Sequence, residues 1–77
     1  MTISEQSKLR LSQLIDEGEN LNPFNLIEFY NWLEASHEAL GFHPVQQGRF
    51  DEYCRSSYDS PSMRRFVGVW MLKQALY

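Results

Sequence analysis

The side chains best suited to chemistry in this chain are two histidines, one cysteine and two neighbouring carboxylates. They are His37, His43, Asp51, Glu52 and Cys54. These are ligand types that zinc accepts, but zinc motifs place their ligands in pairs about two to five residues apart, and neither local spacing matches one. We therefore predict no metal site. His37 is expected at the edge of the core with one hydrogen bond, and His43 is expected to cap a helix.

A cysteine beside a histidine can also act as a nucleophile. Cys54, however, falls on the predicted buried edge of its helix, where a thiol behaves as a small unreactive apolar group. Asp59-Ser60 is similar to the Asp-Ser of acyl carrier proteins, but in carriers that serine opens the second helix, whereas Ser60 precedes the last one. A helix N-cap explains Ser60 without a cofactor. We expect no catalytic residue, no cofactor and no enzymatic activity.

The basic side chains gather towards the end of the chain. A DNA-binding recognition helix is polar and basic, whereas the segment with Arg64 and Arg65 also carries Phe66, Trp70 and Met71, which suit a core or a protein partner. Two arginines in a first helical turn oppose the helix dipole, so we expect them to face a carboxylate on this chain or on a partner. A small DNA-binding regulator is the alternative function, using Arg49, Arg55, Arg64 and Arg65.

Clusters of glycine, proline and small polar residues divide the chain into four segments of helical length. We predict an all-α, four-helix domain covering residues 1–77, with helices at about 4–17, 23–40, 44–55 and 61–76. The expected N-caps are Thr2, either Asn22 or Asn25, His43, and Ser60 followed by Pro61. The expected left-handed stops are Gly18 and Gly41.

The last predicted helix is apolar on nearly all sides. One broad side carries Met63, Phe66, Val67, Trp70 and Met71, and most of another carries Val69, Leu72 and Leu76. Only a narrow line remains, formed by Arg64, Gly68 and Ala75. Four short helices cannot easily cover one member all round, so either this helix packs centrally against the other three or part of it meets another chain. The expected contact residues are Arg64, Arg65, Val69, Leu72 and Leu76.

Composition limits the class of protein. The chain has 77 residues, of which 43% are hydrophobic and 14% aromatic, which suits one small folded domain rather than a disordered segment. A single cysteine excludes an internal disulfide, and no signal-peptide pattern or membrane-length apolar run is present. These features predict a soluble cytoplasmic protein without a membrane partner.

Charge is divided unevenly along the chain. Residues 1–48 carry two basic and seven acidic side chains, whereas residues 49–77 carry five basic and three acidic ones. Such complementary halves suit head-to-tail or heterotypic pairing, although an imbalance of this size also arises by chance. The net charge of −3 disfavours nonspecific nucleic-acid binding.

The hydrophobic spacing of residues 9–54 resembles short helical accessory segments at the ends of large bacterial signalling and defence proteins. The resemblance rests on Leu11, Leu14-Ile15, Glu17-Gly18, Leu21, Phe29, Trp32-Leu33, Leu40 and Phe50. It implies an adaptor that pairs with like modules and carries no catalytic residue. Together with the apolar last helix, it leads us to predict a protein–protein interaction module, including the case of a homodimer through that helix.

Overall fold

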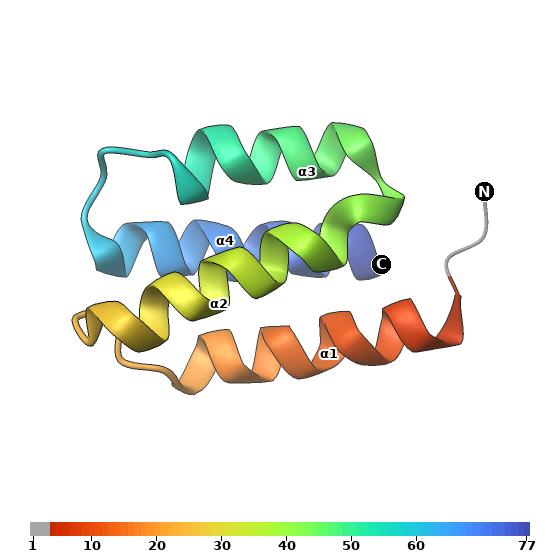
Figure 1. Cartoon of the computed structure of the whole chain (residues 1–77), viewed down its shortest axis with the longest axis horizontal. Helices are drawn as coiled ribbons and strands as arrows, with labels where there is room; N and C mark the ends of the chain where they lie inside the picture. Colours follow the sequence, from red (N-terminus) through yellow and green to blue (C-terminus); the bar gives the residue numbers. More distant parts are fainter. Residues whose placement is uncertain (1–3) are drawn as a thin grey trace.

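The predicted helical segments form an up-and-down bundle of four helices in the computed structural model, which describes residues 4–77 (Figure 1). The helices are α1 (Glu5–Asn20), α2 (Leu26–Ala39), α3 (Pro44–Phe50) and α4 (Pro61–Leu76). A 3₁₀ turn, η1 (Leu40–Phe42), ends α2, and a π-helical turn, η2 (Asp51–Arg55), extends α3. The prediction of an all-α, four-helix fold is confirmed. Among residues 4–77, no helix combines the length and apolar character needed to cross a membrane.

Side-chain caps begin α2, α3 and α4 at residues that the sequence predicted. Asn25, the second of the two candidates for α2, accepts a hydrogen bond from the Glu28 amide. The His43 ring and the Ser60 hydroxyl cap α3 and α4 in the same way. These bonds satisfy amides that have no partner inside the helix. For α1 the cap is Ser4, which accepts from the Ser7 amide, while Thr2 lies outside the described residues.

The two glycine stops were predicted wrongly. Gly18 lies inside α1, and α2 ends through the 3₁₀ turn at Leu40–Phe42. No glycine in residues 4–77 has a positive φ. Position 18 requires glycine for a different reason: a Cβ atom there would lie 2.5 Å from the ring of Trp32 and 2.7 Å from a methyl of Val69. It allows close packing of helices rather than a left-handed turn.

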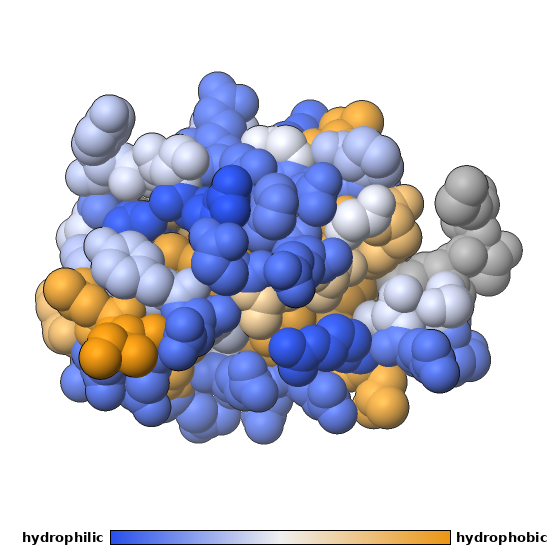
Figure 2. Space-filling view, in the orientation of Figure 1, coloured by the Kyte–Doolittle hydropathy of each residue, from blue (hydrophilic) through white to orange (hydrophobic). Residues whose placement is uncertain are grey.

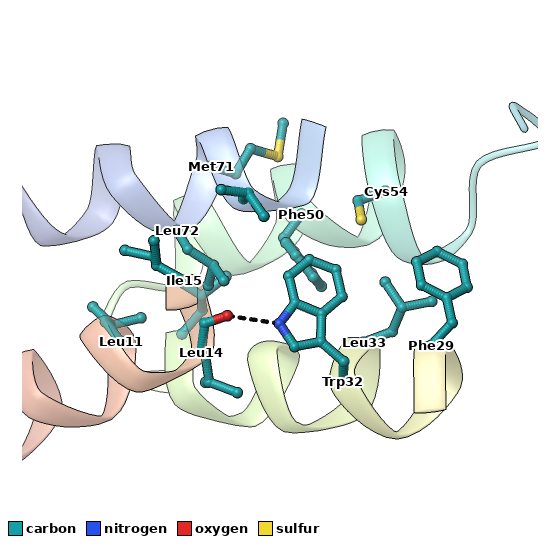
Figure 3. Packing of buried hydrophobic residues seen from close by; sticks show 12 residues of the cluster. Leu11, Leu14, Ile15, Phe29, Trp32, Leu33, Phe50, Cys54, Met71 and Leu72 are labelled. Atoms are coloured by element: carbon teal, nitrogen blue, oxygen red, sulfur yellow. Dashed lines mark hydrogen bonds between the residues drawn. The ribbon is translucent and has the colours of Figure 1, made fainter. Parts of the chain in front are cut away.

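Trp32 occupies the centre of the core (Figure 3). Its indole Nε1–H donates a 2.8 Å hydrogen bond to the backbone carbonyl of Leu14, which ties α2 to α1. A second glycine, Gly68 of α4, faces the same ring, because a Cβ atom at that position would lie 2.8 Å from it. The bulkiest side chain of the core is therefore accommodated by glycines on two neighbouring helices.

The π-helical turn η2 adjusts the register of the segment that follows α3. The Ser56 amide donates to the Asp51 carbonyl at 2.7 Å, a five-residue step that widens the helix. Phe50 and Cys54 are both fully buried, whereas Tyr53 between them is exposed. The segment ends at Arg55, as predicted, and sequence periodicity contained no sign of the wider turn.

Candidate interaction surface

The exposed side of α4 carries three large apolar side chains. Met63, Phe66 and Trp70 are 50%, 67% and 53% exposed, and we call them the α4 face. Phe66 and Trp70 each lie two residues from Gly68, hence roughly 200° round the helix from it. Gly68 contacts Trp32 in the core, so the α4 face points away from the bundle. Large aromatic side chains left in water on a core helix are typical of an interaction surface.

Trp70 forms a ridge between two shallow grooves. The groove towards α1 has a volume of about 270 Å³ and is lined by Glu19, Arg65, Phe66, Val69, Trp70 and Lys73. The groove towards α3 has a volume of about 420 Å³ and is lined by Gln46, Arg49, Tyr53, Trp70, Met71 and Gln74. The groove towards α1 is mainly apolar, whereas the groove towards α3 is mainly polar. An apolar centre with a more polar rim is the usual plan of a protein interface.

The structure corrects the predicted contact residues of α4. Val69 and Leu72 are only 8% and 0% exposed, and Leu76 packs against the core, so these side chains belong to the interior of the chain. Gly68, which belongs to the narrow line left between the two apolar sides, is the position of α4 that approaches Trp32. Gly68 was the available signal, because a glycine inside a helix can allow close contact with a bulky neighbour, although Gly48 shows that it need not.

Arg64 and Arg65 bind backbone carbonyls rather than the expected carboxylates. Arg64 donates to the carbonyls of Cys54 at 2.8 Å and Arg55 at 2.7 Å, and its guanidinium lies 5.2 Å from the Phe29 ring centre. Arg65 donates to the carbonyl of Gly18 at 2.9 Å. All three carbonyls belong to the last turns of helical segments, where the backbone carries partial negative charge. The arginines thus tie α4 to the ends of α1 and η2.

Ion pairs join the acidic and basic halves within the chain itself. Arg55 binds Glu34 of the acidic half at 3.0 Å, and it also binds Asp51 of its own half at 2.9 Å. Lys73 binds Glu19 at 2.8 Å, and that hydrogen bond raises the pKa of the lysine. Arg55, Arg64 and Arg65 therefore already have partners for some of the donors that a DNA phosphate would need.

The structure does not bring the histidines and the cysteine together. His37 Nδ1 lies 2.7 Å from Asp51 Oδ1 and is partly buried, which confirms a core-edge histidine with one side-chain partner. Cys54 donates from its Sγ to the Arg64 carbonyl at 3.0 Å and is fully buried, as predicted. Among residues 4–77, no three histidine, cysteine, aspartate or glutamate side chains are grouped so as to hold a metal ion.

Because the Cys54 thiol is buried, we expect the protein to lose stability at alkaline pH. Burial raises its pKa from 9.0 to about 12, so between these values the unfolded chain releases a proton that the folded chain retains. The contribution of this thiol to the stability is constant below about pH 9 and falls as the pH rises towards 12, by up to about 1.4 kcal/mol per pH unit. Urea unfolding at several pH values should show this slope. Cys54→Ala should remove that part of it, and an unchanged slope in the variant would contradict the assignment.

Searches of protein-family models, curated proteins and solved structures find no match to this chain. A function has to be inferred from the surface itself. A third groove, between α1 and α2, has a mainly apolar lining that also includes two glutamates and two asparagines, and it contains no histidine or cysteine that could form a matched acid and base. The α4 face differs from this groove because it leaves large apolar side chains exposed to water, which favours contact with a partner.

Proposed function

We propose that this chain is a small, non-enzymatic protein-interaction module that binds through the α4 face. The observation that carries the proposal is the exposure of Met63, Phe66 and Trp70 on a helix whose opposite side is core. Trp70 stands between two grooves that a partner's side chains would fill. Tryptophans in such central positions carry much of the binding energy of protein interfaces.

Self-association is part of the proposal. The resemblance of residues 9–54 to accessory helical segments supports it, because such segments pair with like modules. The single thiol needs no oxidising compartment, which supports a role in the cytoplasm. In this role the chain would act as an adaptor or regulator that binds other proteins and catalyses no reaction.

Fluorine NMR tests whether the α4 face is covered in solution. The chain has two tryptophans, so labelling with 5-fluorotryptophan gives two signals, which a Trp70→Phe variant assigns. We expect the Trp70 signal to shift as the protein is concentrated from about 1 µM to about 1 mM, a range that covers binding energies of about −8 to −4 kcal/mol. The buried Trp32 is the internal reference. A Trp70 signal that stays constant over this range would contradict self-association through this face.

Trp70→Glu should weaken the association strongly and leave the fold unchanged. A central tryptophan contributes about 2 kcal/mol or more to an interface, which corresponds to a loss of affinity of about 30-fold or more. Sedimentation equilibrium measures the loss, and circular dichroism checks the helices. Leu9→Glu is the matched control, because Leu9 is similarly exposed on α1 and lines neither groove beside Trp70. An equal loss in the control would show a nonspecific effect of charge.

A further inference from the structure

Helices α2 and α4 carry opposite charges without exception. Within Leu26–Ala39 there are three glutamates and neither lysine nor arginine, and within Pro61–Leu76 there are two arginines and one lysine but no acidic residue. Beside the α4 face, Arg49, Arg65 and Lys73 edge the two grooves, against a single carboxylate, Glu19. The α4 side of the molecule is therefore basic around an apolar centre.

The outward side of α2 combines exposed apolar residues with acidic ones. Tyr30 and Glu34 each lie two residues from the buried Trp32, hence on the opposite side of the helix, and Ile27 and Glu38 continue the same side. We call these four residues the α2 face. Figure 2 shows a mostly hydrophilic surface with a hydrophobic patch at the end of the bundle where α2 begins. Exposed apolar residues there include Phe24 and Ile27.

The α2 face and the α4 face lie on opposite sides of the molecule. Helix α4 runs behind α2 when the bundle is viewed down its shortest axis, which is 17 Å long (Figure 1). Trp32 points inward from α2 and meets Gly68, which points inward from α4. Both helices begin at the same end of the bundle. If a second copy is moved along the shortest axis without rotation, the α2 helix of one copy comes to lie beside the α4 helix of the other. The two helices then run in the same direction.

We propose that copies of this chain stack head to tail, with the α4 face of one copy against the α2 face of the next. The inference rests on the proposed function and names the partner surface. In this arrangement Ile27 and Tyr30 of one copy meet Phe66 and Trp70 of its neighbour, and the glutamates of α2 meet the basic edges of the grooves. Such a contact joins two different surfaces, so it does not close after two copies and leads to longer assemblies.

Charge also disfavours the symmetric alternative. A twofold contact between two α4 faces would bring Arg49, Arg65 and Lys73 of one copy towards the same basic set of the other, and like charges facing each other in an interface are unfavourable. Glu34 already binds Arg55 within its own chain, whereas Glu38 has no ion-pair partner among residues 4–77. Because the contact uses opposite charges near the surface, raising the salt concentration should weaken it.

Mixing two variants tests the arrangement. Trp70→Glu blocks the α4 face and Ile27→Lys blocks the α2 face, and both side chains are exposed, so the fold should persist. Each variant alone should be monomeric in sedimentation velocity, with self-affinity reduced by about 30-fold or more for the blocked tryptophan. An equimolar mixture should form a dimer and grow no further, because each variant retains the surface that the other lacks. Wild-type protein should form larger species as its concentration rises.

The other outcomes separate the two proposals. If Ile27→Lys alone still self-associates while Trp70→Glu does not, the α4 face is an interaction surface but head-to-tail stacking is wrong. A wild type that stays monomeric at about 1 mM, or a mixture that yields no dimer, also overturns stacking. If Trp70→Glu associates as strongly as wild type, both stacking and self-association through the α4 face are overturned. Leu9→Glu, which leaves both faces intact, should behave as wild type.

Discussion

Leu72→Glu should unfold this protein, whereas Trp70→Glu, two residues earlier, should leave it folded. Leu72 is fully buried among the core side chains of all four helices, and Trp70 is 53% exposed. Truncating a buried leucine costs about 2 to 5 kcal/mol, and an unpaired carboxylate in its place adds several more. The sum is comparable with the whole stability of a domain of this length, about 4 to 12 kcal/mol.

Circular dichroism and thermal unfolding distinguish the two variants directly. We expect Leu72→Glu to lose most helical signal at 25 °C, or to melt without a cooperative transition, whereas Trp70→Glu should melt close to the wild type. Leu72→Met is the control, because a similar volume without charge should cost less than about 1.5 kcal/mol. A well-folded Leu72→Glu protein would mean that this side of α4 is accessible, and the assignment of core and surface on α4 would then be reversed.

The sequence predicted the helices well because their signals are local. Asn25, His43 and Ser60 cap the helices that follow them, and each cap involves residues only three positions apart. The burial of Cys54 also followed from spacing within its helix. The Gly18 stop failed because glycine has two uses that look alike in sequence, a left-handed turn or a close contact. Gly41 serves neither use: it lies within the 3₁₀ turn η1, and a Cβ atom there would meet only the Gln47 side chain, at 3.8 Å. Only the positions of Trp32 and Val69, far away in sequence, decide that Gly18 serves the second use.

The orientation of α4 could not be read from its own sequence. A helix that is apolar on nearly all sides gives periodicity little contrast, and the sequence predicted the partner contact at Val69, Leu72 and Leu76 instead of at Phe66 and Trp70. Trp32 already fills the centre, so α4 places Gly68 against it, buries Val69, Met71 and Leu72 beside it, and leaves Phe66 and Trp70 outside. The partners of Arg64 and Arg65 could not be predicted either. They are backbone carbonyls at helix ends, and every residue has a backbone carbonyl, so the sequence does not distinguish them.

Gly68→Ala should destabilise the protein, whereas Gly48→Ala should stabilise it. Alanine is favoured over glycine inside a helix by about 1 kcal/mol, and at Gly48 a Cβ atom has no heavy atom within 4 Å, so that gain is realised. At Gly68 the new atom would lie 2.7 Å from Cys54 Sγ and 2.8 Å from the Trp32 ring. Overpacking of a core costs about 1 to 3 kcal/mol, which exceeds the gain in helix propensity.

Combining Gly68→Ala with Gly18→Ala should give the larger effect, because both substitutions press on the same ring from different helices. The Trp32 indole is rigid and anchored to the Leu14 carbonyl, so it cannot move away from one helix without approaching another. We expect the double variant to lose about 2 to 4 kcal/mol, measured by urea unfolding with Gly48→Ala in parallel. If all three glycine positions gained stability, helix propensity alone would govern them. The close approach of α1 and α4 to Trp32 would then not be a packing constraint.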